Sequence, residues 1–232
     1  MITGNRRHRY NFDFKCGWDY NLWDSYYAYL ERACQMGRAV LLNVRGRHED
    51  VVRKKITMAQ WAEACKKGIK HYKEKFPKLR YIEVLNEYHL AGFGGISDEQ
   101  YYEFYRVAYM LVAEVNHELR PTVPLLVGGL CVVGGTLMAG ENRTRLRAFL
   151  RNYAADPSVY KKLEFISYHQ YGEGDNLSVV AGQEALIRTW CREMGISAGP
   201  PIMVSEIGVF PGSKRATSIE ADHLIQASAM NT

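Results

Sequence analysis

The 232-residue sequence lacks the short motifs that mark the commonest metal and nucleotide sites. Its five cysteines lie far apart and form no C-x-x-C pair, which argues against a zinc site and against a dense disulfide framework. It has no H-x-H or H-E-x-x-H pattern, and the glycines between positions 92 and 95 lack the G-x-G-x-x-G spacing. We therefore expect neither a metal ion nor an organic cofactor, and we expect His48, Asp50 and His89 to be solvated loop residues.

Long hydrophobic runs and a strong charge of one sign are also absent. The uncharged stretch from 123 to 140 contains Pro124 and two glycine pairs, which predicts a strand and a glycine-rich loop rather than a membrane span. No apolar stretch follows the basic start MITGNRRHRYNFDF, so we expect no signal peptide in this chain. The cellular compartment is not determined by the sequence, because a chain that derives from a longer precursor could be secreted. The formal charge of +5 is modest, and we rank nucleic-acid binding last among the functions considered.

What the sequence does contain is a repeated β-α pattern. Strands are predicted to begin near residues 39, 81, 125, 165 and 202, one about every 40 residues. Apolar residues at helical spacing predict a helix before each strand, over residues 18–36, 57–75, 97–119, 143–160 and 183–194. No linker or change in composition interrupts the pattern, so we predict a single domain over residues 1–232.

The strands are apolar without polar alternation, which is typical of a parallel sheet that is covered on both faces or closed into a barrel. A doubly wound open sheet is the alternative. Polar residues end four of the five strands, and a (β/α)₈ barrel would gather such ends at one mouth. These polar ends read Asn43-Val-Arg45, Asn86-Glu87, His169-Gln-Tyr171 and Ser205-Glu206.

The predicted fold class is therefore α/β, a (β/α)₈ barrel. Five strands fall short of eight, and the first two strands and the last strand of such a barrel have no counterpart in the sequence. We expect either a fragment of a longer chain or an incomplete barrel. An open parallel barrel would expose strand edges, which favours association. The oligomeric state cannot be predicted from these features.

Glu87 and Glu206 are the candidate catalytic pair. Two carboxyl groups across a cleft can divide the work of glycoside cleavage, one donating a proton to the leaving oxygen and the other attacking the anomeric carbon. A separation of about 5 to 5.5 Å would give retention of configuration, and one of about 6.5 Å or more would give inversion.

The neighbouring polar residues suit the same chemistry. Asn86 can hold a sugar 2-hydroxyl, while His169 and Tyr171 share one face of their strand, where a tyrosine hydroxyl can orient the nucleophile. Asn43 and Arg45 are further candidates for substrate binding. Glu83, in the same strand as Glu87, is predicted to be a buried carboxylate that pairs with a cation, for which Arg45 is the candidate.

Three segments carry a resemblance to a known family. "IEVLNE", "FISYHQYG" and "PIMVSEIG" resemble the fourth, sixth and seventh strands of retaining clan A glycoside hydrolases, and the intervening pieces resemble family 39, which contains β-xylosidases and α-L-iduronidases. The resemblance runs from about Tyr20 to Gly212. It implies that Glu87 is the acid/base and Glu206 the nucleophile, with Asn86, His169 and Tyr171 at the sugar site.

The sequence departs from the family around the proposed acid. The family usually has an aromatic residue before Asn-Glu and Pro-Asn after it, whereas here these places hold Leu85, Tyr88 and His89. The leading hypothesis is a retaining glycoside hydrolase that binds a β-linked carbohydrate. The alternative is a catalytically inactive carbohydrate-binding remnant of a barrel.

Overall fold

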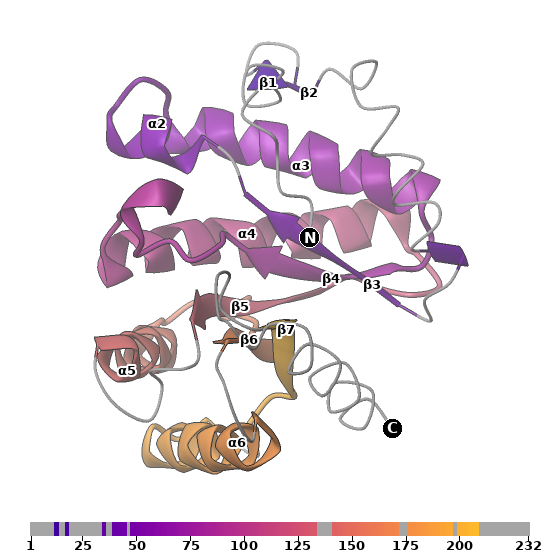
Figure 1. Ribbon diagram of the computed structural model, residues 1–232. Helices are drawn as coiled ribbons and strands as arrows, with labels where there is room; N and C mark the ends of the chain where they lie inside the picture. The colour runs from indigo at the N-terminus through magenta and orange to yellow at the C-terminus, as the bar shows by residue number, and fades with distance from the viewer. Residues whose placement is uncertain are drawn as a thin grey trace. The chain divides into compact units, whose positions relative to one another are not determined.

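The computed structural model describes residues 12–13, 17–18, 34–35, 39–45, 47–133, 141–171, 176–196 and 199–208. The elements in chain order are β1 (Phe12–Asp13), β2 (Gly17–Trp18), β3 (Val40–Val44), α2 (His48–Val52), α3 (Met58–Lys75), β4 (Leu79–Val84), η3 (Ala91–Phe93), α4 (Asp98–Leu119), β5 (Leu126–Val133), α5 (Glu141–Ala155), β6 (Phe165–Tyr171), α6 (Asn176–Glu193) and β7 (Ile202–Gly208) (Figure 1).

Five of the strands form one sheet, in the order β3-β4-β5-β6-β7. The pairs β3–β4, β4–β5 and β6–β7 are parallel. Parallel strands in sequential order with helices between them are the arrangement of a (β/α)₈ barrel, and the described residues contain five of its eight strands. The predicted fold class, an incomplete barrel of this type, is confirmed. The predicted helix over 18–36 lies almost wholly outside the described residues.

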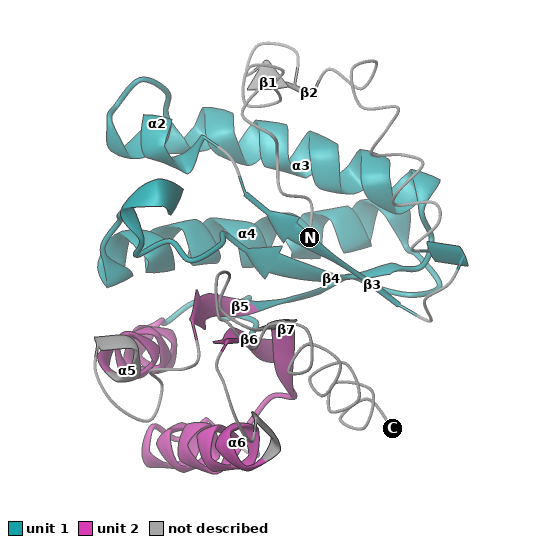
Figure 2. Ribbon diagram, in the orientation of Figure 1, with its two compact units in different colours: residues 1–128, 157–164 teal, residues 129–156, 165–232 magenta. Residues whose placement is uncertain are grey.

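The chain divides into two compact units (Figure 2). Unit 1 comprises residues 1–128 and 157–164, and unit 2 comprises residues 129–156 and 165–232, so that β5 begins in the first and ends in the second. That these residues form a single domain stays a prediction. Among the described residues, no helix is both long and apolar enough to cross a membrane.

Unit 1 is built on the packing of α3 and α4, which run beside each other (Figure 1). Both helices begin with a capping box, in which Thr57 and Ser97 accept a hydrogen bond from the backbone N–H three residues on. α4 buries a set of aromatic side chains. They include Tyr101 and Tyr105, both fully shielded from solvent.

Trp61 is the residue of α3 on which the stability of unit 1 should depend most. Its side chain is 0% exposed, and its ring lies 4.9 Å from that of Phe104 on α4 in an edge-to-face contact. We expect Trp61→Ala to lower the free energy of unfolding by about 3 to 5 kcal/mol, because the substitution leaves a large cavity. Met110→Ala, at an exposed position of α4, is the control and should change it by less than about 0.5 kcal/mol. Urea denaturation of both variants measures the difference, and equal midpoints would contradict the prediction.

Unit 2 contains α5, α6, β6 and β7, and its core is formed by large side chains from both helices and from β6. Phe149 and Leu150 of α5, Ile187 and Trp190 of α6, and Phe165 of β6 are each at most 2% exposed. α6 is also tied to β6 by a buried amide pair, in which Gln183 Nε2 donates to Gln170 Oε1 at 3.0 Å. This buried hydrogen bond joins α6 to the strand that carries the polar residues discussed below.

Candidate active site

In unit 1, Asn86 and Glu87 lie near the end of β4, as the sequence predicts, with Leu85 between the strand and Asn86. The backbone there is unusual, since Leu85 has φ 56° and Glu87 has φ 41°. Residues other than glycine in the left-handed region cost roughly 1 to 2 kcal/mol each. Such strain is retained where surrounding contacts enforce it, and it is frequent at functional sites.

Tyr88 fixes the position of this turn through its packing and its hydrogen bond. It is 0% exposed, stacks on Tyr101 with 4.1 Å between ring centroids, and donates a hydrogen bond to Asp98 Oδ1 at 2.9 Å. Tyr101 in turn donates to the Val84 carbonyl at 3.1 Å, at the end of β4. The tyrosine that stands after Asn-Glu is therefore a core residue that fixes the backbone on which Glu87 sits. The Glu87 side chain is itself 9% exposed.

Asn43 ties the end of β3 to the same turn. Its amide nitrogen donates to Glu83 Oε2 at 2.9 Å and to the Leu85 carbonyl at 2.7 Å. Both of its amide hydrogens are thus engaged with β4 and the strained residue that follows it. Asn43 was expected to contact substrate; these bonds also give it a structural role.

Glu83 is buried, as predicted, at 3% exposure, but its predicted partner is wrong. Among the described residues it is bonded to Asn43, while the Arg45 guanidinium lies over the Phe93 ring at 4.3 Å from the centroid. The physical reason is register: Asn43 and Glu83 are direct partners in the β3–β4 pairing, whereas Arg45 lies beyond the end of β3. A short-range amide bond to the carboxylate therefore replaces the expected ion pair.

The expectation that His48 is a solvated loop residue is also wrong. It is 1% exposed, begins α2, and its Nε2 lies 2.7 Å from the Phe93 carbonyl. Because a carbonyl only accepts, Nε2 carries the hydrogen. Gly94 has φ 115°, and a Cβ there would lie 2.5 Å from His48 Nε2, so only glycine fits. Asp50 is likewise part of α2, where its carboxylate accepts from Arg47 Nε at 2.7 Å.

In unit 2, three predicted site residues meet at the ends of β6 and β7. His169 and Glu206 are direct partners in the parallel register, which shifts just before His169. Tyr171 donates its hydroxyl hydrogen to Glu206 Oε2 at 2.5 Å, and His169 Nε2 lies 3.4 Å from Glu206 Oε1. The histidine side chain is 0% exposed and that of Glu206 is 10% exposed. Glu206 is thus a nearly buried carboxyl group with a neighbour at each oxygen.

Cys131 is a contributor that the sequence did not single out. Its Sγ lies 3.1 Å from His169 Nε2, and both side chains are 0% exposed. Cys131 is a buried free thiol. Its contact with a residue 38 positions away leaves no local pattern by which it could be found.

Glu87 belongs to unit 1, and His169, Tyr171 and Glu206 belong to unit 2. Within unit 1 the structure gathers Asn43, Glu83 and Leu85, and within unit 2 it gathers Cys131, His169, Tyr171 and Glu206. That Glu87 and Glu206 act on one sugar stays a prediction.

No protein family profile matches the sequence, and no curated protein matches it. Two solved structures of a family 128 (subgroup I) endo-β-1,3-glucanase from Amycolatopsis mediterranei are similar. The complex of a variant with laminaripentaose has a TM-score of 0.46 and 17% identity, and the complex with laminaritriose has 0.44 and 18%. Each match covers 83% of this chain and 66% of that chain, so this chain spans slightly under two thirds of the enzyme's length. A similarity of this size assigns no activity.

Proposed function

We propose that this chain carries the catalytic carboxyl groups of a retaining glycoside hydrolase, with Glu206 as nucleophile and Glu87 as acid/base. The observation that carries the proposal is the setting of Glu206, which lies in the last three residues of a parallel strand and accepts the Tyr171 hydroxyl at 2.5 Å. A carboxylate held by a short, charge-assisted bond is oriented before substrate arrives.

The two oxygens of Glu206 would have different tasks. Oε2 accepts from Tyr171, which fixes the plane of the carboxyl group, while Oε1 has the longer 3.4 Å contact with His169. The less tightly bonded oxygen is the better nucleophile, so Oε1 is assigned to attack the anomeric carbon. The result is a covalent glycosyl-enzyme that water then cleaves.

Glu87 would serve as the acid and then as the base. Its position after an apolar strand, its 9% exposure and the left-handed backbone beneath it support the assignment. It protonates the leaving oxygen in the first step and deprotonates water in the second. Asn86, buried beside it, would hold the sugar 2-hydroxyl, a contact that strengthens in the transition state.

The remaining assignments concern substrate contacts and the type of substrate. Arg45, stacked on Phe93, would contact the carbohydrate from the end of β3, and Asn43 would act chiefly by holding the turn that carries Glu87. A β-linked substrate and the type of site found in family 39 follow from the sequence resemblance. The reaction needs neither metal nor organic cofactor, because the two carboxyl groups supply both proton transfer and nucleophile.

Turnover on a panel of substrates tests the proposal. The purified chain is incubated with aryl β-xylosides and aryl β-glucosides, and with xylan and β-1,3-glucan, and proton NMR follows the first anomer released. We expect the β-anomer to form first, because two inversions give retention. First release of the α-anomer would refute the double displacement.

A second candidate function is carbohydrate binding without catalysis. It is favoured by the count of parallel strands in the described residues, five where a complete barrel has eight. Calorimetric titration with the same oligosaccharides decides between the two. Saturable binding with no product after prolonged incubation would favour the binding protein and exclude the enzyme.

Tyr171→Phe tests the setting of the nucleophile. Removing the hydroxyl deprives Glu206 of its 2.5 Å donor, so we expect kcat to fall by roughly 10- to 100-fold, the scale on which misplacement of a reacting group acts. Tyr168→Phe is the matched control on the same strand. The Tyr168 hydroxyl is buried with no hydrogen-bond partner among the described residues, so its loss should leave kcat unchanged. Equal rates in the two variants would contradict the role given to Tyr171.

A further inference from the structure

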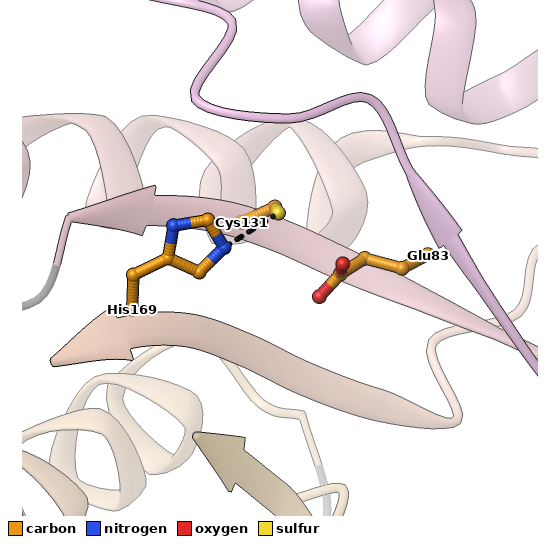
Figure 3. Close-up of side chains that lie close together, drawn as sticks. All are labelled: Glu83, Cys131 and His169. Atoms are coloured by element: carbon orange, nitrogen blue, oxygen red, sulfur yellow. Dashed lines mark hydrogen bonds between the residues drawn. The ribbon is translucent and has the colours of Figure 1, made fainter. Parts of the chain in front are cut away.

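Cys131 and His169 form a buried pair beside the proposed nucleophile. Cys131 lies in β5 and His169 in β6, both in unit 2, and Figure 3 shows the thiol directed at the imidazole ring. The Sγ–Nε2 distance is 3.1 Å. The same Nε2 lies 3.4 Å from Glu206 Oε1, so one ring nitrogen faces both a thiol and a carboxyl group.

The backbone at Cys131 is strained. Its φ is 59°, in the left-handed region, although it stands inside a buried strand. Glycine would adopt this conformation without cost, and the strand does contain glycine at 128 and 129. A side chain retained where glycine would relieve strain is an observation from which a functional role can be inferred.

The neighbours of His169 Nε2 favour a hydrogen on this nitrogen. An ionised carboxylate only accepts, so the contact with Glu206 is attractive only when His169 Nε2 carries a hydrogen. A thiol can donate or accept. With Nε2–H as the donor, the Cys131 sulfur at 3.1 Å is the acceptor, and Glu206 Oε1 lies 3.4 Å from the same nitrogen.

We propose that Cys131 is a positioning residue, which accepts from His169 Nε2–H and so holds the imidazole in the orientation that Glu206 requires. The sulfur also draws the shared hydrogen partly away from Glu206. Oε1 therefore keeps only a weak contact and stays available for attack. This inference rests on the proposed function of Glu206 as nucleophile.

Three variants separate this role from simple packing. Serine keeps an acceptor at position 131, whereas alanine removes it. We expect Cys131→Ala to lower kcat by about 10- to 100-fold. Its KM should be nearly unchanged, because the thiol is shielded from substrate. Cys131→Ser should keep most of the activity. Cys191→Ala, at another buried thiol of unit 2, is the control and should turn over at the wild-type rate. A serine variant no better than the alanine variant, at matched melting temperature, would overturn the proposal.

A readout independent of turnover completes the test. Long-range ¹H–¹⁵N correlation spectra of the uniformly labelled full chain report the tautomer of each of its seven histidines, and His169→Gln identifies the relevant signals. We expect the Nε2–H tautomer at His169 in all three chains, because Glu206 also requires it. The chemical shift of the Nε2–H proton should be alike in the wild-type and serine chains and different in Cys131→Ala, where the hydrogen is no longer shared with an acceptor at position 131. The same spectrum in all three chains would refute the role of the thiol. If the wild type cleaves no glycoside, the proposed function fails while these spectra still decide the inference.

Discussion

Glu206→Gln is expected to lower kcat/KM for aryl β-glycosides by at least about 10⁴-fold. Loss of a nucleophile is among the most damaging single changes to an enzyme that works through a covalent intermediate. Glutamine has nearly the same shape and can still bond to Tyr171, so the fold of unit 2 should be kept. Initial rates with a dinitrophenyl glycoside measure the effect, and the melting temperature checks the fold.

External azide should restore turnover in Glu206→Gly and reveal the role of the missing group. Azide can enter the space left by the nucleophile and attack the sugar from the same side, so a β-glycoside should give an α-glycosyl azide. Glu193→Gln, at an exposed residue of the same unit, serves as the control and should react like the wild type without azide. Undiminished turnover in Glu206→Gln, or a β-azide from Glu206→Gly, would contradict the assignment.

Glu87→Ala should have an effect that depends on the leaving group. General acid catalysis contributes about 10²- to 10⁴-fold, and substrates whose leaving groups need little protonation lose the least of it. We expect a loss near the upper end of this range for unactivated glycosides. For dinitrophenyl glycosides the first step should be nearly unaffected, so a rapid burst of phenolate should precede slow hydrolysis. Stopped-flow absorbance resolves the burst.

Azide should also distinguish the role of Glu87 from that of Glu206. In Glu87→Ala the glycosyl-enzyme still forms on the α-side, so azide attacks from the opposite face and gives a β-glycosyl azide. Glu103→Ala, at an exposed residue of α4, is the control for unit 1 and should show neither burst nor azide product. Losses that are equal for activated and unactivated substrates would show that Glu87 is not the acid.

The five strands of the parallel sheet could be predicted from sequence because each is a compact apolar run, and four of them have a polar end. β3 and β6 begin within a residue of the expected positions, and the polar ends fall where strand periodicity places them. Helix ends were less accurate. α5 ends at Ala155 rather than at 160, because Pro157 disfavours helical geometry in the residue before it. α6 begins at Asn176 rather than at 183.

The features that could not be predicted depend on contacts between distant segments. α2 has five residues, too few for a periodic pattern, and His48 is buried through a bond to the Phe93 carbonyl 45 residues away. The partner of Glu83 is set by the β3–β4 register, 40 residues apart. The left-handed backbone of Cys131 has no signature in the sequence around it.

In the candidate site, too, local features could be predicted from sequence and contacts between distant segments could not. Residue type and position at a strand end were enough to single out Glu87, Glu206, His169 and Tyr171. Which groups bond to Glu206 follows from the β6–β7 register, in which His169 and Glu206 are opposite each other. Tertiary packing decides the rest, as in the stacking of Tyr88 on Tyr101 beneath the Glu87 turn.

The distance between the carboxyl groups of Glu87 and Glu206 tests the central claim most directly. A crystal structure of Glu206→Gln with an oligosaccharide bound measures it between Glu87 and the glutamine amide that replaces the second carboxyl group. The proposed mechanism predicts about 5 to 5.5 Å, with the two groups on opposite sides of one glycosidic bond. A separation of about 6.5 to 9.5 Å would indicate inversion and contradict the covalent intermediate, and a sugar that touches only one of the two residues would contradict the shared site itself.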